Sequence, residues 1–335
     1  MNYSGLQPRW LLEKIECFHF GSPTTRFQWW YFDLLLKDGS MLIVALVPQQ
    51  WWQSDLTSSD TSTSTLFVTL RSPSGVIKKW TVTRPQSELA LSDARVALGD
   101  IFSIHKKNGE YHVAIRLDGI KGTLRVQSSV KPFAVSEFGT LPMWLLYMLS
   151  LKRAPISYVS FVPRDRAWVE LEVENREIKQ EATAYHEQGR FDGTAHDLSR
   201  EGWIWFHIFG EEWGVFGAEN AYIYITGDDT LIRHGYPMRK ETFTLTRKQY
   251  WQYDKRVLQA ATLDFKIPEI SLTAIFEPTN EENLIHYSSS DSRELWSTRY
   301  TTARVSIEYS GKTYSFSSPA LLETCRYKCN VLTAH

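Results

Sequence analysis

The stretch ATAYHEQGRFDG, residues 182 to 193, brings a hydroxyl, an imidazole and a carboxyl group together in three consecutive residues. Side chains alternate between the two faces of an extended strand, so Tyr185 and Glu187 should share one face while His186 points to the other. A carboxyl group on an apolar, water-poor face favours its neutral form and can act as a general acid. We predict that Glu187 is the catalytic acid or base and that Tyr185 and His186 orient it. The alternative is an exposed polar loop that carries these residues by chance.

Two aromatic stretches could form walls beside such a site. In FQWWYFD, residues 27 to 33, strand alternation places Trp29, Tyr31 and Asp33 on one face and Trp30 on the other. Indole and phenol rings present large, flat apolar surfaces with a polar edge, and their π-faces attract positive charge. This pattern predicts contact with an apolar ligand on one side of the strand and core packing on the other.

The second aromatic stretch is GWIWFHIFG, residues 202 to 210. Its alternation leaves an aliphatic and phenylalanine face opposite a face of indoles and an imidazole. The indole face suits contact with a polyene or with a developing cation, although an exposed amphipathic strand is the alternative. The predicted substrate-binding residues are Trp29, Trp30, Tyr31, Asp33, Trp203, Trp205 and His207.

Metal and nucleotide chemistry have little support in the sequence. His105 with His112, and Cys325 with Cys329, lack the tight paired spacing of zinc sites. The chain contains no GxGxxG, Walker, HExxH or GxSxG motif. We therefore expect no metal and no cofactor.

The composition of the chain limits further which kinds of molecule it could bind. The chain of 335 residues has 37 Lys and Arg against 38 Asp and Glu, so it lacks the basic footprint of a nucleic-acid-binding protein. Its 43% hydrophobic content supports a substantial core, and 14% aromatic content suits a β-rich fold or a pocket for flat, apolar molecules. Three cysteines are too few for a disulfide framework, and no signal-peptide pattern opens the chain, which together predict a cytoplasmic location. The oligomeric state cannot be read from these features.

One segment of the sequence is unusually apolar. TLPMWLLYMLSLKR, residues 140 to 153, ends in two cations but is too short to span a bilayer. It could form a buried core helix, a lid over an apolar cavity, or a peripheral membrane contact.

Most of the chain alternates at the period of two that is typical of strands. Turn signals such as Asn108-Gly109, Glu174-Asn175 and Ser310-Gly311 punctuate the strands, and no alternating helices appear. The polar run at residues 55 to 65 is expected to be an exposed loop. We predict an all-β protein of two units, residues 1–181 and residues 182–335, which could be distant duplicates.

Two of these stretches resemble one family. WWYFD at residues 29–33 and FVPRDRAWVELEVENREIKQEATAYHE at residues 161–187 resemble the hydroxyneurosporene synthase (carotenoid hydratase) and AttH-like family, which is related to lipocalin-like Diels-Alderases. The resemblance implies two lipocalin-like (calycin-type) β-sandwich or barrel domains with a hydrophobic cavity near their junction. Tyr185 and His186 match the family's Tyr-His pair, and Glu187 stands where the family has an aspartate.

The chain also departs from the family pattern. Gln28 replaces the glutamate before the double tryptophan, and QGRF at residues 188–191 replaces His-Asn-Trp-Gly. The residues and the resemblance together predict a cofactor-independent lyase or isomerase. It would hydrate, cyclise or isomerise a polyene, terpenoid or polyketide of secondary metabolism. The alternative is a non-catalytic carrier of a hydrophobic small molecule.

Overall fold

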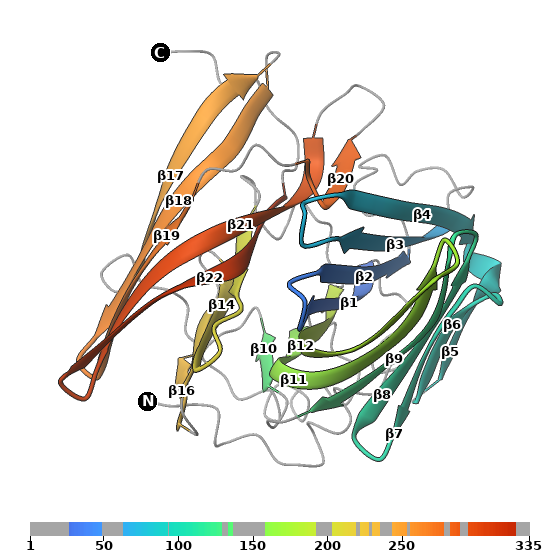
Figure 1. The fold of residues 1–335 in the computed structure, drawn as a ribbon, viewed down its shortest axis with the longest axis horizontal. Helices are drawn as coiled ribbons and strands as arrows, with labels where there is room; N and C mark the ends of the chain where they lie inside the picture. The colour runs from blue at the N-terminus through green and yellow to red at the C-terminus, as the bar shows by residue number, and fades with distance from the viewer. Residues whose placement is uncertain are drawn as a thin grey trace. The chain divides into compact units, whose positions relative to one another are not determined.

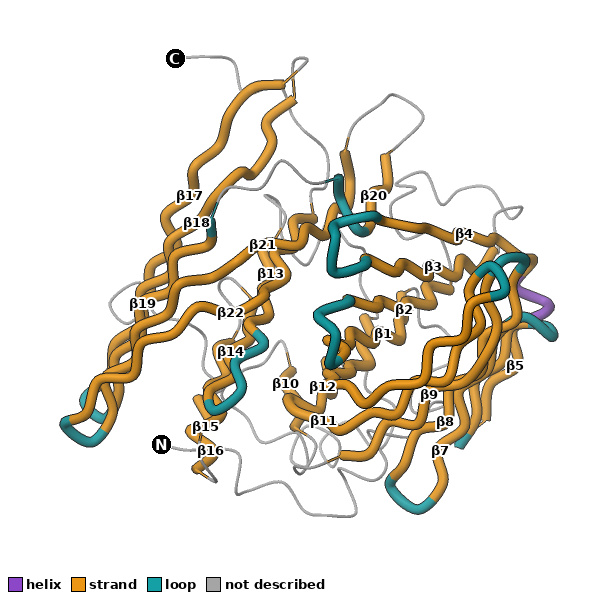
Figure 2. Tube along the Cα trace, viewed as in Figure 1, coloured by secondary structure: helices purple, strands orange, loops and turns teal. Residues whose placement is uncertain are grey.

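The computed structural model describes residues 27–48, 63–92, 94–128, 133–136, 158–191, 203–218, 222–227, 230–234, 243–252, 255–277, 282–288 and 294–325. Nearly all of them are in β-strands (Figures 1 and 2). The only helix within these residues is a 3₁₀ turn, η2 (Gln86–Glu88). The predicted all-β fold is therefore confirmed.

The chain divides into two compact units, with unit 1 ending at Asp197 and unit 2 beginning at Leu198. The boundary predicted between residues 181 and 182 lies inside strand β12 (Arg176–Phe191). That strand has 16 residues, far longer than an average strand, and pairs with unit 1 strands along its whole length.

Unit 1 is built from one antiparallel sheet of 12 strands. The order along the sheet is β4-β3-β2-β1-β12-β11-β9-β8-β7-β6-β5, and β10 pairs with β11 outside this path. The strands are β1 (Phe27–Leu36), β2 (Met41–Pro48), β3 (Thr63–Arg71), β4 (Ile77–Pro85), β5 (Leu89–Ser92), β6 (Arg95–Leu98), β7 (Phe102–Lys107), β8 (Glu110–Leu117), β9 (Ile120–Ser128), β10 (Phe133–Ser136), β11 (Tyr158–Val173) and β12.

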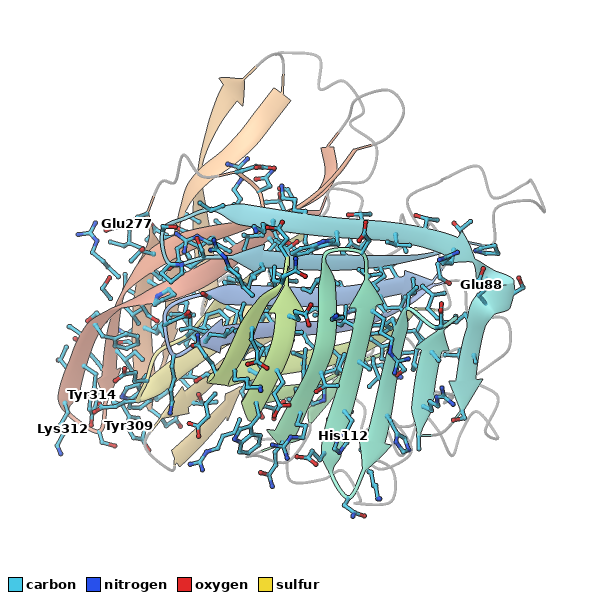
Figure 3. The ribbon with its side chains drawn as sticks, turned by 45° about the vertical axis from the view of Figure 1, so that its right-hand side comes forward. Glu88, His112, Glu277, Tyr309, Lys312 and Tyr314 are labelled. Atoms are coloured by element: carbon cyan, nitrogen blue, oxygen red, sulfur yellow. The ribbon has the colours of Figure 1, made fainter. Side chains whose placement is uncertain are left out.

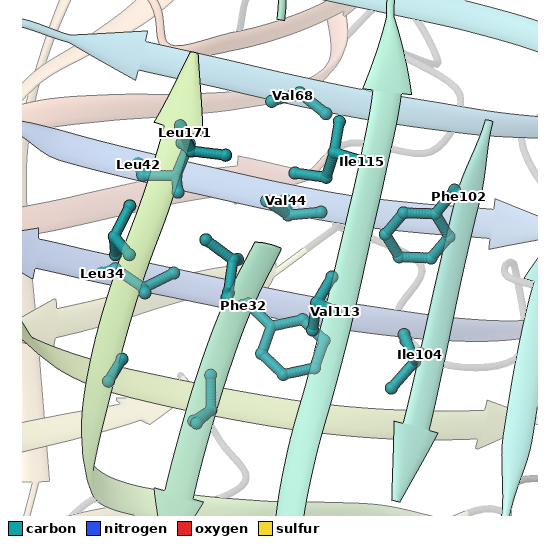
Figure 4. Packing of buried hydrophobic residues seen from close by; sticks show 14 of the residues in the cluster. Phe32, Leu34, Leu42, Val44, Val68, Phe102, Ile104, Val113, Ile115 and Leu171 are labelled. Atoms are coloured by element: carbon teal, nitrogen blue, oxygen red, sulfur yellow. The ribbon is translucent and has the colours of Figure 1, made fainter. Parts of the chain in front are cut away.

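The unit 1 sheet curls around a single apolar core, as in a nearly closed barrel. Side chains from β1, β2 and β3 meet side chains from β7 and β8 across this core, as Phe32, Val44 and Val113 do in Figure 4. Val44 is fully buried, and Phe32 and Val113 keep no more than 2% of their surface exposed. Burial of this kind is worth about 1.5–3 kcal/mol for each large apolar side chain and is the main force that closes the sheet.

Unit 2 contains one antiparallel sheet of 10 strands in the order β16-β15-β14-β13-β22-β21-β19-β18-β17, with β20 paired to β21. The strands are β13 (Trp203–Ile208), β14 (Trp213–Ala218), β15 (Tyr222–Gly227), β16 (Thr230–His234), β17 (Phe243–Gln252), β18 (Lys255–Ile267), β19 (Ile270–Phe276), β20 (Ile285–Ser288), β21 (Glu294–Tyr309) and β22 (Lys312–Cys325). At the end of the β21–β22 hairpin, Tyr309 and Tyr314 flank Lys312 (Figure 3). The rings of both tyrosines pack on the buried Trp213, with centroids 5.8 and 5.1 Å away.

The predicted hairpin turns are confirmed. Asn108-Gly109, Glu174-Asn175 and Ser310-Gly311 each join two paired strands, and all six residues have positive φ. Positive φ at both central residues defines the type I′ geometry that suits the twist of a two-residue hairpin. Local turn chemistry therefore fixes the register of these hairpins.

The β1–β2 turn is also tied to β12. Asp38 accepts a hydrogen bond of 2.8 Å from the Gln180 side chain, and its backbone N–H donates to the Gln180 oxygen at 3.1 Å. Burial raises the pKa of Asp38, but the hydrogen bonds from Gln180 and from the Ser40 backbone outweigh it and hold the pKa below its ordinary value. The turn thus helps to hold β1 beside β12.

The predictions for the polar run at residues 55–65 and for the apolar run at residues 140–153 have different outcomes. Thr63, Ser64 and Thr65, expected at the end of an exposed loop, belong to β3, and Ser64 and Thr65 are buried. Residues 140–153 lie outside the described residues. Among the described residues, no helix has the length and apolar character needed to cross a membrane. The cavity near the junction of the units stays a prediction.

Candidate active site on β1 and β12

The candidate site is organised by the antiparallel pairing of β1 with β12. In this register Trp29 lies opposite Gly189, Tyr31 opposite Glu187, and Asp33 opposite Tyr185. Residues that lie directly opposite each other share a face of the sheet, with Cβ atoms about 4.5–5.5 Å apart. The chemically capable residues of two segments about 150 residues apart in the chain are thus gathered on one face.

Glu187 is held by two hydrogen-bond donors on this face. The indole Nε1–H of Trp29 donates to its Oε1 at 2.8 Å. The hydroxyl of Tyr185 donates to its Oε2 at 2.5 Å. Tyr185 is fully buried, whereas Trp29 and Glu187 are half-buried. The carboxyl group is therefore fixed in orientation at a partly accessible position.

Gly189 leaves the space that the Trp29 indole occupies. A Cβ atom at this position would lie 1.8 Å from the nearest carbon of the indole ring, so no larger residue fits beneath it. A glycine opposite an aromatic ring lets the ring lie flat across the neighbouring strand. From there the indole nitrogen reaches Glu187, two residues away on β12.

Tyr31 and Asp33 complete the face. The Tyr31 ring meets the Tyr185 ring edge to face, with centroids 6.3 Å apart. Asp33 is fully buried, although carboxylates are rarely found so far from water. The predicted grouping of Trp29, Tyr31 and Asp33 on the side of Glu187 agrees with the observed register.

Apolar side chains extend this face across β2 and β3. Ile43, Ala45 and Phe67 lie in register with Asp33 and Tyr31, and no more than 4% of any of them is exposed. The opposite face of the same strands belongs to the barrel core. These strands are buried on both faces, which is typical of sheets covered on both sides. The site therefore lies beside a buried floor in which apolar side chains predominate.

His186 lies on the other face. Its Nδ1 is 2.6 Å from Oδ2 of Asp165, and both residues are buried. The imidazole stacks on Phe32 with centroids 5.5 Å apart and lies 4.2 Å from the Tyr111 ring. The predicted alternation, with His186 on the face opposite Tyr185 and Glu187, agrees with this geometry, so His186 could orient Glu187 only through the strand that carries both.

Trp30 and Asp165 also lie on the core face. Trp30 lies opposite Trp29, Tyr31 and Asp33, as the alternation predicted, and only 2% of it is exposed, so it does not share the face of Glu187. Asp165, the partner of His186, was missed, because it follows a register shift between Val162 and Asp165 that the sequence pattern does not reveal. A bulge of this kind reverses which residues of β11 face the core.

The aromatic residues predicted from residues 202 to 210 belong to β13 in unit 2. Trp205 and His207 are buried, with ring centroids 6.1 Å apart. They lie opposite the core face formed by Ile204, Phe206 and Ile208. The side chain of Trp203 lies outside the described residues. Within the part of the chain that the structure describes, no group of three His, Cys, Asp or Glu side chains could hold a metal ion.

Neither a protein-family model nor a curated protein sequence matches this chain. Solved structures share its fold. An AttH-like protein from Nitrosomonas europaea aligns over 92% of this chain and 95% of its own, with 13% identity and a TM-score of 0.58. Kievitone hydratase from Nectria haematococca aligns over 92% of this chain and 91% of its own, with 9% identity and a TM-score of 0.57.

A third structure, CghA with the compound Sch210972, aligns over 91% of this chain and 89% of its own, with 10% identity and a TM-score of 0.59. The coverage is nearly complete in all three comparisons. At these identities they establish a shared lipocalin-like all-β fold.

Proposed function

We propose that the protein is a cofactor-independent enzyme that hydrates, cyclises or isomerises a hydrophobic polyene, terpenoid or polyketide, with Glu187 as its proton-transfer group. The observation that carries this proposal is the pair of hydrogen bonds that Trp29 and Tyr185 donate to one half-buried carboxyl group. The shared fold of a hydratase, and of a protein solved with a small molecule, supports the same class of function.

The two donors restrict where a proton can sit on Glu187. An indole N–H can only donate, so Oε1 is always an acceptor. We place the transferred proton on Oε2, next to the hydroxyl of Tyr185, through whose short hydrogen bond it can pass. Donors on both oxygens also stabilise the ionised carboxylate, in contrast to the neutral acid expected from burial alone. In this proposal Glu187 begins the cycle as a base.

Proton transfer then runs through the Tyr185–Glu187 pair. Glu187 accepts a proton from the substrate, directly or through the phenol of Tyr185, and the same route returns it to another carbon or oxygen. Positioned acid–base groups of this kind typically contribute about 10²–10⁴-fold to a rate. Hydration needs an acid as well as a base, and Asp33, on the same face, is our candidate for that acid.

His186 takes a different role from the one first assigned to it. Its bond to Asp165 lies on the core face of β12, so we assign it the positioning of the strand that carries Glu187. Trp29 and Tyr31 remain the proposed contacts for the substrate's apolar skeleton on the site face. Trp205 and His207 of unit 2 are retained as substrate-binding residues of the proposal, on the strength of their aromatic face.

Glu187→Gln tests the proposal most directly. The purified protein would be incubated in D₂O with acyclic polyenes such as lycopene and with linear terpenoid alcohols, and the products followed by mass spectrometry. Hydration adds the mass of one water, whereas cyclisation and isomerisation leave the substrate mass unchanged apart from exchanged deuterium. We expect Glu187→Gln to lower kcat by about 10²-fold or more.

Glu181→Gln is the matched control, because Glu181 lies on the same strand in an exposed pair with Lys37. Its turnover should equal that of the wild type. Unchanged turnover in Glu187→Gln would refute acid–base catalysis by this residue. Tight binding of the polyenes without any turnover by the wild type would favour the carrier function instead.

A further inference from the structure

The outer face of the unit 1 sheet carries an excess of cations on strands β6 to β9 (Figure 1). Side chains that point into the barrel core alternate along these strands, so the residues between them face outward. Two histidines, His105 and His112, are on the outer face, and the four strands contain one carboxylate, Glu110. The arginines and lysines of the outer face are Arg95, Lys107, Arg116, Lys121 and Arg125.

The middle of this face is a row of basic residues that ends at a tryptophan. Arg95 on β6 lies opposite His105 on β7, which lies opposite His112 on β8. His112 in turn lies opposite Arg125 on β9, and Arg125 lies opposite Trp168 on β11. Neighbouring strands are about 4.8 Å apart, so Arg95 and Arg125 are about 14 Å apart along this basic row. His112 is labelled in Figure 3.

Most of the cations on this face have no carboxylate partner. Within the described residues, no ion pair involves Arg95, Lys107 or Arg116. All three side chains are exposed. Glu110 is engaged by His112, whose Nε2 lies 2.9 Å from its Oε2. The positive charge of the basic row is therefore available to a partner.

The carboxylates of the neighbouring strands β11 and β12 are paired with lysines. Glu172 binds Lys121 at 3.0 Å, which makes Lys121 the paired cation of the face. Glu177 binds Lys179 at 2.6 Å, and Glu170 lies opposite the same lysine. These carboxylates therefore leave the basic row without neutralisation, and a second copy of the chain would offer it the same paired carboxylates. An anionic partner of another kind fits the row better.

Trp168 helps to decide between anionic partners. The guanidinium group of Arg125 lies over its ring, 5.3 Å from the centroid. That ring face is thus occupied and does not provide the open platform on which a nucleic-acid base would stack. A half-buried indole beside an arginine instead suits the headgroup level of a bilayer, where tryptophan places its apolar body and polar edge.

The surroundings of the basic row also differ from the centre of a protein interface. On one side the row is bordered by the short side chains of Ser103, Ala114 and Thr123, which lie opposite one another on β7, β8 and β9. The centre of a protein interface is usually apolar and poor in charge, which this face is not. A bilayer rich in anionic lipid needs only projecting cations, each of which is attracted within a Debye length of its surface.

We propose that the outer face of β6 to β9 docks the protein on an anionic phospholipid bilayer. Arg95, Lys107 and Arg125 contact the headgroup phosphates, and Trp168 lies at the headgroup level. This face is separate from residues 140–153, for which the sequence also allowed a membrane contact. Docking does not depend on the catalytic role proposed for Glu187.

Cosedimentation of the full chain with vesicles tests the proposal. One set of vesicles would contain phosphatidylcholine alone, and the other an equal mixture of phosphatidylcholine and phosphatidylserine. Each cation near an anionic surface contributes about fivefold to binding, so the wild type should prefer the mixed vesicles about a hundredfold. The double variant Arg95→Gln, Arg125→Gln should reduce that preference about twentyfold.

Two further variants control this experiment. The double variant Lys266→Gln, Lys312→Gln removes two exposed cations of unit 2 and changes the net charge equally, so it should leave the preference unchanged. Trp168→Ala should weaken binding to the mixed vesicles but leave its dependence on salt unchanged, because no charge is removed. Circular dichroism and thermal unfolding would establish that each variant is folded.

A single substitution keeps the proposal testable if the double variant of the basic row does not fold. Lys107→Gln changes an exposed side chain without an ion pair and should lower the preference for the mixed vesicles about fivefold. Equal binding of the wild type to both kinds of vesicle would overturn the proposal, as would a preference that survives undiminished in these variants. Binding of polyglutamate or of a DNA duplex without a preference for the mixed vesicles would also overturn it, in favour of an acidic macromolecule.

Discussion

Replacing Gly189 with alanine should disrupt the contact that orients Glu187. A Cβ atom at this position would lie 1.8 Å from the nearest carbon of the Trp29 indole, far closer than the 3.4 Å of ordinary van der Waals contact. The indole would have to move by more than about 1 Å, which is enough to lose its hydrogen bond to Glu187. Overpacking costs about 1–3 kcal/mol, and a hydrogen bond to a charged group is worth about 1.5–3 kcal/mol. We expect the free energy of unfolding to fall by about 2–4 kcal/mol.

A double-mutant cycle with Trp29→Ala isolates this contact. The free energy of unfolding of the four proteins would be measured by urea denaturation followed by circular dichroism. In the Trp29→Ala background the ring is absent, so Gly189→Ala should be nearly neutral or stabilising by about 0.5 kcal/mol, because alanine loses less backbone entropy on folding than glycine. An equal cost of Gly189→Ala in both backgrounds would refute the packing of the indole over residue 189.

Three further predictions concern a buried pair and two turns. Asp165→Ala removes the buried partner of His186 and should lower the free energy of unfolding by about 3 kcal/mol in urea denaturation; a loss typical of a surface change would contradict the buried pair. Asp38→Ala should cost about 0.5 kcal/mol at neutral pH after allowance for solvent screening. Because the folded-state pKa of Asp38 lies below its ordinary value of 3.8, that cost should begin to shrink below that pH and be lost as the pH falls through the folded-state pKa; a cost that grows in acid would contradict this linkage. Gly311→Ala, at a φ of +75°, should cost about 1 kcal/mol in thermal unfolding, whereas an unchanged Tm would contradict the left-handed turn.

The turns and the faces of single strands could be predicted from the sequence because neighbouring residues determine them. Residue pairs such as Glu174-Asn175 and Ser310-Gly311 favour positive φ, and they form the tight hairpins that were expected. Period-two alternation correctly placed Trp29, Tyr31 and Asp33 on one face. Neither inference requires knowledge of which strands pair at long range.

The rest of the site depends on long-range pairing, which leaves no local signal. Trp29 and Glu187 are 158 residues apart, and only the pairing of β1 with β12 brings them together. The Asp165–His186 pair also depends on an irregular register in β11.

The face on which a side chain lies, more than its chemical type, divides the roles within Tyr185, His186 and Glu187. All three can transfer or orient protons, but the strand sends His186 into the barrel core and the other two to the opposite face. The core-facing residue can therefore stiffen β12 without touching the substrate, while Tyr185 and Glu187 remain available for chemistry. The same division recurs in unit 2, where Leu322 packs in the core and Glu323 faces away from it. A strand that is buried on both faces can in this way pack against the core with one set of side chains and hold polar groups among apolar ones with the next residues along the chain.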